Sequence, residues 1–240
     1  MDPNVRAWTE FVFNIAYLVT VWVVIFAMLR RQKFLEPKDR TIGRQFTLAF
    51  SLLAAGDLAH VGFRIIAFLQ GVPVFDTSPG ATSVLLGIGT LATSITVTLF
   101  YIMMAIIWRR RFKKPYGWFG ILIILAGFAR LIIMVFPQNQ WPLLVAPPQW
   151  SLYRNIPLAI LGLGVAFLLL RDSIASNDRL YKWIGICILL SFAFYLPVIL
   201  FIDQAPMVGM LMIPKTLAYL AMAILTYLWL FRSTLPKHRQ

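Results

Sequence analysis

The chain has few acidic residues, two histidines and one cysteine. Only nine of its 240 residues are Asp or Glu, against 22 Lys or Arg. The single cysteine, Cys187, cannot form a disulfide within the chain. With only His60 and His238 available, a metal site built from several histidines is excluded, and we predict no metal. No serine–histidine or cysteine–histidine arrangement typical of nucleophilic catalysis is evident.

Long polar stretches are also scarce, which sets the chain apart from soluble globular domains. Charged residues make up 13% of the sequence and hydrophobic residues 60%. Seven apolar stretches, each long enough to cross a bilayer as a helix, account for nearly all of it. They lie near 8–29, 46–69, 83–108, 118–136, 153–170, 183–203 and 208–231. We therefore predict an all-α polytopic membrane protein with seven transmembrane helices in a single domain over residues 1–240. The start of the chain lacks the features of a signal peptide, so we expect the first span to be retained.

The basic residues concentrate in alternate connections between the predicted spans. The connections on one side, with the C-terminal tail, hold 17 of the 22 Lys and Arg residues. The connections 70–82, 137–152 and 204–207 hold none. This asymmetry predicts a multi-pass protein of the cell membrane with its N-terminus outside and its C-terminus inside. We interpret the net charge of +13 as topology and contact with anionic lipid headgroups, not nucleic-acid binding. A cytoplasmic partner protein or a second copy of the chain stays open.

The second predicted span carries three ionisable residues on one helical face. Asp57, His60 and Arg64 follow one another at spacings of i, i+3 and i+7. Ionisable groups are costly in hydrocarbon, so they mark either a site or a structural ion pair. Asp57 falls near the middle of the membrane, whereas Arg64 lies close enough to the outer boundary to reach it. His60 is either a proton partner of Asp57 or a structural histidine.

Other spans carry polar groups at comparable depth. The candidate site residues, with the second-span residues, are Glu10, Asn14, Asp57, His60, Arg64, Arg130, Arg154, Asn155, Tyr195, Lys215 and Tyr219. All fall at the middle of the membrane or in its outer half, whereas the inner half of each span is apolar or mildly polar. We predict that they line an outward-facing pocket for a small anionic or zwitterionic molecule, with Asp57 as the partner of Arg130. The alternative is an ion-pair network that only fixes helix packing.

Prolines and one repeated segment bear on the helix geometry. Pro197 and Pro214 predict kinks in the last two spans, and Pro157 fits the first turn of the fifth. The connection 137–152 has too many turn formers for a helix and predicts a loop or a cap. The segments TLFYIMMAI, from Thr98, and TLAYLAMAI, from Thr216, are similar, as two parallel three-helix units joined by the fourth helix would give.

Three functions are compatible with such a pocket. We favour a receptor-like or sensor protein that binds the small molecule. The alternatives are a transporter of 3+1+3 helix architecture and a membrane-embedded enzyme acting on a lipid headgroup, although no catalytic residue can be assigned. A lysine in a seventh helix also fits a retinal Schiff base, but the third span has no Asp or Glu as counterion. We therefore predict no cofactor, with retinal on Lys215 as the alternative.

Overall fold

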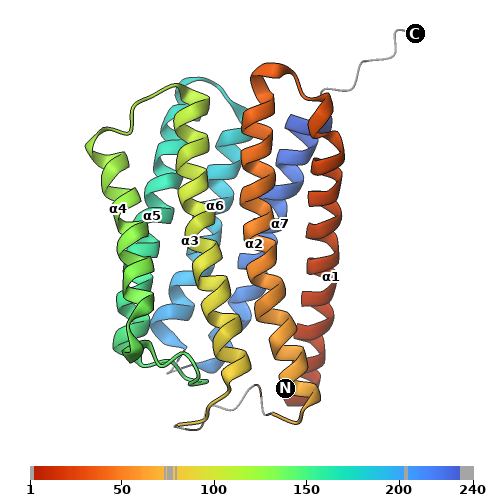
Figure 1. Ribbon diagram of the computed structural model, residues 1–240, viewed down its shortest axis with the longest axis vertical. Helices are drawn as coiled ribbons and strands as arrows, with labels where there is room; N and C mark the ends of the chain where they lie inside the picture. The colour runs from red at the N-terminus through yellow and green to blue at the C-terminus, as the bar shows by residue number, and fades with distance from the viewer. Residues whose placement is uncertain (1–2, 73, 75–77, 79, 203–204, 233–240) are drawn as a thin grey trace.

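The protein is a bundle of long helices (Figure 1). The structure is a computed structural model that describes residues 3–72, 74, 78, 80–202 and 205–232, and the side chains of residues 3–11 and 206 lie outside this description. The long helices are α1 (Pro3–Arg31), α2 (Pro37–Leu69), α3 (Val84–Phe112), α4 (Gly117–Val135), α5 (Pro148–Ala175), α6 (Arg179–Phe201) and α7 (Met212–Thr226). Short 3₁₀ segments are η1 (Gln32–Phe34), η2 (Pro137–Asn139) and η3 (Pro206–Leu211), and a π-helical turn, η4 (Tyr227–Arg232), extends α7.

The helix boundaries have local chemical causes. Ser83 and Asp178 cap α3 and α6, since each side chain accepts a hydrogen bond from a backbone N–H of the first turn. Pro37 and Pro148 begin α2 and α5, where a missing N–H costs nothing. Lys113, in the left-handed conformation with a φ of 52°, ends α3.

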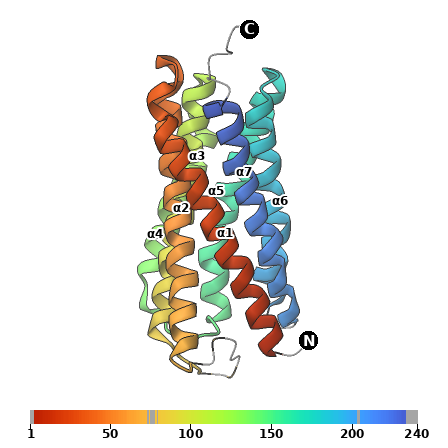
Figure 2. The same ribbon diagram turned by 90° about the vertical axis from the view of Figure 1, so that its right-hand side faces the viewer.

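The helices follow one another around the bundle in chain order. Each packs against its neighbours in the sequence, α1 closes the bundle against α7, and α3 also packs against α5 (Figures 1 and 2). The start of α1 and the end of η4 lie at opposite ends of the bundle (Figure 1). We call the end with the α1–α2, α3–α4 and α5–α6 connections the basic end, and the other the opposite end.

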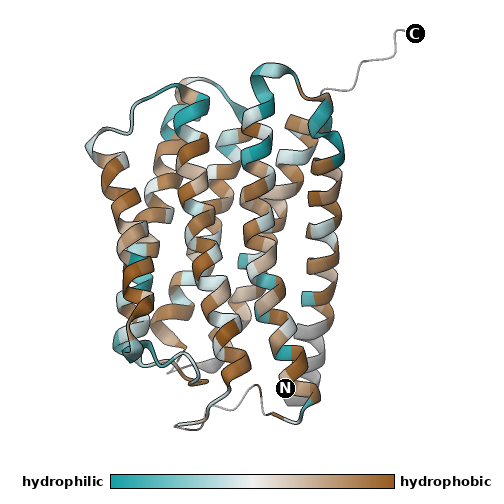
Figure 3. Cartoon of the chain, in the orientation of Figure 1, coloured by the Kyte–Doolittle hydropathy of each residue, from teal (hydrophilic) through white to brown (hydrophobic). Residues whose placement is uncertain are grey.

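The surface of the bundle is apolar along its length. Large hydrophobic side chains such as Val23, Leu125 and Val135 are exposed, and hydrophilic residues gather at the basic end (Figure 3). Within the described residues, seven helices are long and apolar enough to cross a membrane. The prediction of an all-α, seven-helix, multi-pass membrane protein is thus confirmed. Which end faces the cytoplasm stays a prediction.

The structure corrects two predictions about prolines. Because α5 begins at Pro148, Pro157 lies inside that helix and not in its first turn. Pro214 lies in the first turn of α7, because the 3₁₀ segment η3 precedes it and α7 begins at Met212. Pro197 does lie inside a helix, α6, as expected.

Aromatic rings in tilted and edge-to-face contact fill the core on the basic side of the bundle centre. Phe50 lies 5.8 Å from Phe100 between ring centroids, and Phe100 lies 5.2 Å from Tyr101. Tyr101 in turn lies 5.6 Å from Phe192. We call these four residues the aromatic layer. Their side chains are all buried and join α2, α3 and α6 into one apolar core.

Candidate functional site

A cavity of about 60 Å³ lies among the helices at the centre of the bundle. Side chains from α2 through α7 surround it, and we call it the central cavity. They are Leu53, Asp57, Thr93, Ser94, Val97, Arg130, Leu158, Ser191, Phe192, Tyr195, Lys215 and Tyr219. The volume is enough for a few water molecules or a carboxylate-sized group, and is far below that of pockets for drug-sized ligands.

Asp57 enters the cavity from α2 and is held by two hydroxyl groups. The Tyr17 hydroxyl of α1 donates to Asp57 Oδ2 at 2.7 Å, and the Thr93 hydroxyl of α3 donates to Oδ1 at 3.3 Å. No ion pair of Asp57 occurs among the described residues. The carboxylate therefore connects α1, α2 and α3 through hydroxyl donors alone. The predicted partnership of Asp57 with Arg130 is not found.

Arg130 donates hydrogen bonds to uncharged oxygen atoms. Its Nε donates to the Arg154 carbonyl at 2.8 Å, and its Nη1 donates to the Ser94 carbonyl at 2.8 Å and to the Thr98 hydroxyl. The side chain is only 2% exposed. The Thr98 hydroxyl itself donates to the Ser94 carbonyl at 2.7 Å, so both acceptors of Nη1 belong to one turn of α3. Arg130 thus joins α3, α4 and α5 without neutralising its charge on a carboxylate.

Lys215 reaches the cavity from α7 over two aromatic rings. Its Nζ lies 4.1 Å from the ring centroid of Tyr195 and 5.8 Å from that of Tyr219. Cation–π contact of this kind stabilises an ammonium but leaves its three N–H donors available. In the described part of the chain, Lys215 Nζ has neither a hydrogen-bond acceptor nor a carboxylate within ion-pair distance.

The two tyrosines are fixed by hydrogen bonds on their far sides. The Tyr195 hydroxyl donates to Asn155 Oδ1 at 3.0 Å, and the Tyr219 and Tyr101 hydroxyls lie 2.9 Å apart. Tyr219 therefore ties α7 to the aromatic layer, and Tyr195 ties α6 to α5. Both rings are held in the orientation in which Lys215 packs against them.

The α4–α5 loop, at the opposite end, is held to α4 and α5 by side-chain contacts. The Arg154 guanidinium lies 4.5 Å from the ring centroid of Trp141 and donates to Asn139 Oδ1 at 3.4 Å. Asn139 is fully buried and donates to the carbonyls of Ile133 and Phe136 at the end of α4. The predicted cap over residues 137–152 is thus partly a short 3₁₀ turn and a loop, and partly the beginning of α5.

The structure places the predicted site residues in three groups. Asp57, Arg130, Tyr195, Lys215 and Tyr219 line the central cavity. Arg154 and Asn155 lie one contact away from it, through Arg130 and Tyr195 respectively. The third group, Asn14, His60 and Arg64, does not line the cavity.

His60, Arg64 and Asn14 are absent from the described lining of the central cavity. His60 Nδ1 is buried and has no hydrogen-bond partner among the described residues, so an Asp57–His60 proton pair is not formed. Arg64 Nη2 donates to the Val74 carbonyl at 3.3 Å, nearer the opposite end. A shared helical face does not bring these residues to one site, because i+7 spacing separates Asp57 from Arg64 by about 10 Å along the axis. The side chain of Glu10 lies outside the described residues.

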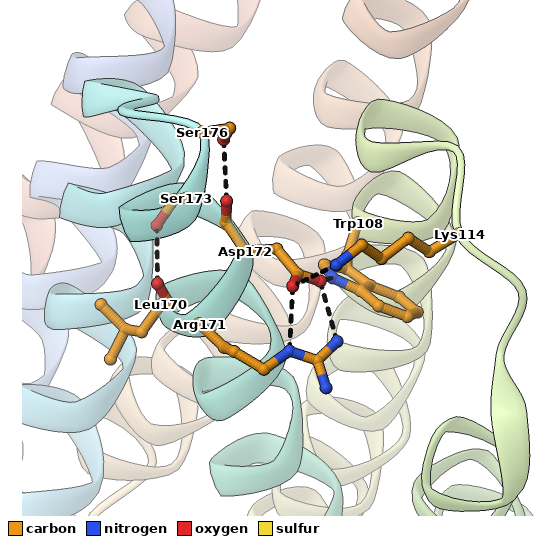
Figure 4. A network of polar contacts seen from close by, with 7 residues as sticks. All are labelled: Trp108, Lys114, Leu170, Arg171, Asp172, Ser173 and Ser176. Carbon is orange, nitrogen blue, oxygen red and sulfur yellow. Dashed lines mark hydrogen bonds and ion pairs between the residues drawn. The ribbon is translucent and has the colours of Figure 1, made fainter.

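A second polar cluster, at the basic end, was missed in the sequence (Figure 4). Asp172 of α5 is 2% exposed and accepts from Lys114 Nζ at 2.7 Å, Trp108 Nε1 at 2.8 Å, and Arg171 Nε and Nη2 at 2.9 and 3.0 Å. We call these four residues the Asp172 cluster. Asp172 and Arg171 lie at the end of α5, beyond the predicted fifth span 153–170, so the expectation of an apolar or mildly polar inner half stays a prediction. The only sequence signal was an acid among basic residues, which does not reveal its partners.

Neither a metal-binding group nor a comparison with known proteins assigns a function to the central cavity. Among the described residues there is no group of three or more His, Cys, Asp or Glu side chains able to hold a metal ion. No protein-family model, curated protein or solved structure matches this chain. The fold and the apolar surface define the class of protein: a polytopic membrane protein with seven candidate membrane-spanning helices.

Proposed function

We propose that the protein is a receptor-like membrane protein whose central cavity binds a small anion or the carboxylate of a small zwitterion. The observation that carries the proposal is the ammonium group of Lys215, which faces the cavity with its donors unused by the described residues. The cavity wall has two cations, Arg130 and Lys215, and one carboxylate, Asp57. An uncompensated charge inside a membrane protein is costly, and an anion placed beside Lys215 lowers that cost.

The surroundings favour a compact guest with acceptor oxygens. Hydroxyl groups of Thr93, Ser191 and Tyr219 line the cavity together with the Lys215 ammonium. The Lys215 ammonium can donate to a carboxylate guest, whereas a cation would find one carboxylate, Asp57, and the hydroxyl oxygens as acceptors. The volume of about 60 Å³ restricts the guest to a group of a few heavy atoms. Within the predicted class of small anionic or zwitterionic molecules, this volume favours the smallest members.

The aromatic layer supports sensing over transport. Its buried rings pack against one another on the basic side of the cavity, and Phe192 belongs both to the layer and to the cavity wall. A transported molecule has to cross this region, whereas a sensed molecule does not. An enzyme has less support, because Asp57 and His60 do not form a pair in the described structure.

Ligand-dependent stabilisation tests the proposal. The purified protein in detergent micelles is titrated with chloride, formate, acetate and glycine while its thermal unfolding is followed. A ligand that binds only the folded state adds about 2.7 kcal/mol at a concentration of 100 Kd. We expect this gain with at least one probe, its loss in Lys215→Met, and its retention in Lys33→Met, which removes an exposed lysine outside the cavity.

Two outcomes reject the proposal. Equal stabilisation of Lys215→Met and the wild type places the anion elsewhere, and no response to any probe removes the anion site. Uptake of the bound probe into proteoliposomes, abolished by Lys215→Met, assigns transport and excludes a purely receptor-like role.

A further inference from the structure

A second and larger cavity lies at the basic end, away from the central cavity. Its volume is about 490 Å³, within the range of small-molecule binding pockets. The end of α5, the turn into α6, the first turns of α6 and the π-helical turn η4 enclose it. The lining residues are Ser173, Ile174, Asn177, Asp178, Arg179, Lys182, Trp183 and Trp229. We call it the basic-end cavity.

The charges of the basic-end cavity favour an anion. Arg179 and Lys182 are exposed cations in its wall, and neither forms an ion pair within the described residues. The one lining carboxylate, Asp178, is already occupied, because Arg111 Nη2 lies 2.7 Å and Arg111 Nε 2.9 Å from its Oδ2. The charge left for a guest is therefore positive. Asn177 and Ser173 add neutral hydrogen-bonding groups to the same wall.

The position and the aromatic rim favour a lipid over a soluble anion. Trp183 and Trp229, with 47% and 38% of their surfaces exposed, lie on α6 and η4 at the end of the apolar surface. Tryptophan side chains prefer the headgroup level of a bilayer, where one side of the ring meets acyl chains and the other meets water. The apolar Ile174, which is also exposed, continues this rim. Cationic pockets between transmembrane helices at this level are suited to phosphate-bearing headgroups.

We infer that the basic-end cavity is a binding site for the phosphoryl headgroup of an anionic phospholipid. Arg179 and Lys182 hold the phosphate, and Trp183 and Trp229 contact the upper acyl chains. This site is independent of the central cavity, because no residue lines both. The proposal also differs from a general attraction of basic loops to a membrane. It assigns headgroup recognition to Arg179 and Lys182 among the many basic residues at this end.

Native mass spectrometry of the detergent-solubilised full chain tests the site. The probes are phosphatidylglycerol, phosphatidylcholine and soluble glycerol 3-phosphate. We expect phosphatidylglycerol to bind more tightly than the other two. Replacing both cations, Arg179→Gln with Lys182→Gln, should weaken its binding roughly 30-fold, from about 1 kcal/mol per basic residue near an anionic lipid.

A charge-matched control separates the site from diffuse electrostatics. Arg40→Gln with Arg110→Gln removes two exposed basic residues of the same end that do not line the cavity. This variant should bind phosphatidylglycerol within twofold of the wild type. Equal weakening in both double variants, or no preference of the wild type for phosphatidylglycerol over phosphatidylcholine, overturns the proposal. Binding of glycerol 3-phosphate as tight as that of the lipid overturns the lipid assignment.

Trp183→Leu gives a second readout that does not alter charge. We expect it to weaken phosphatidylglycerol binding severalfold while leaving glycerol 3-phosphate unaffected, because the ring contacts only the acyl chains, which glycerol 3-phosphate lacks. An unchanged lipid affinity in this variant contradicts the proposed placement of the acyl chains.

Discussion

The Asp172 cluster and the central cavity place charged residues inside the same bundle in opposite ways. Asp172 accepts four hydrogen bonds from Trp108, Lys114 and Arg171, so its charge is fully used within the protein. Among the described residues of the central cavity, Asp57 accepts from two hydroxyls, and Lys215 contacts two aromatic rings. The two charges interact with each other only beyond ion-pair distance. Carboxylates paired with several cationic donors are typical of architecture, whereas charges beside a void that form no ion pair are typical of a site. The comparison therefore distinguishes residues that stabilise helix packing from residues that are available to bind a ligand.

The largest expected effect is on the saturated carboxylate. Asp172→Ala removes the shared acceptor of three side chains from α3, the α3–α4 connection and α5 (Figure 4). We expect a loss of about 3 kcal/mol in the free energy of unfolding, near the lower end for a broken buried pair, because Lys114 and Arg171 are about half exposed. Reversible denaturation in mixed micelles measures it. A loss below about 1 kcal/mol removes the architectural role.

A pair of double-mutant cycles sharpens the picture of Asp57. Because the Tyr17 hydroxyl donates directly to its carboxylate, Tyr17→Phe and Asp57→Asn should couple by about 1 kcal/mol. Asp57→Asn and Arg130→Leu should couple by less than about 0.5 kcal/mol, because no hydrogen bond or ion pair joins them among the described residues. Unfolding free energies of the single and double variants give both values. Stronger coupling in the second cycle contradicts the assigned geometry.

The smallest expected effect on unfolding stability differs in sign between the central cavity and the Asp172 cluster. In buffers without the anionic probes, Lys215→Met removes a buried charge that forms no ion pair with the described residues and interacts with Asp57 only at longer range. It should leave stability unchanged or raise it by about 1 kcal/mol. Lys114→Met removes a donor to Asp172 and should lower stability by about 1 kcal/mol. Thermal unfolding of both variants at low ionic strength tests the contrast. Destabilisation by Lys215→Met that exceeds that by Lys114→Met breaks the comparison.

The fold was predictable because its cause is local. A run of about 20 apolar residues crosses a bilayer as a helix whatever its neighbours do, and seven such runs gave seven helices. Helix ends were less accurate where prolines were involved. Pro148 begins α5 earlier than expected, since proline at a first turn is as compatible with a helix as with the predicted loop.

The site was predictable in part because depth can be read from a sequence but packing cannot. Asp57, Arg130 and Lys215 lie at similar depth, and the structure brings them to one cavity. Which groups contact one another depends on the rotation and tilt of whole helices, and no pattern within one span encodes that. For this reason the expected Asp57–Arg130 pair was wrong, and the donors to Asp57, Tyr17 and Thr93, were not assigned to it.

The α4–α5 loop, at the opposite end, is held to the start of α3 by backbone hydrogen bonds. The Ser83 N–H donates to the Pro142 carbonyl at 2.7 Å, and the Leu144 N–H donates to the Ala81 carbonyl at 2.9 Å. A Cβ atom on Gly87 would lie 2.5 Å from the Trp141 carbonyl oxygen, so the close approach requires glycine there. A molecule that enters between α3 and this loop requires these backbone hydrogen bonds to break first. The rates of ligand entry and exit by that route then depend on local opening of the loop and not on the affinity of the ligand.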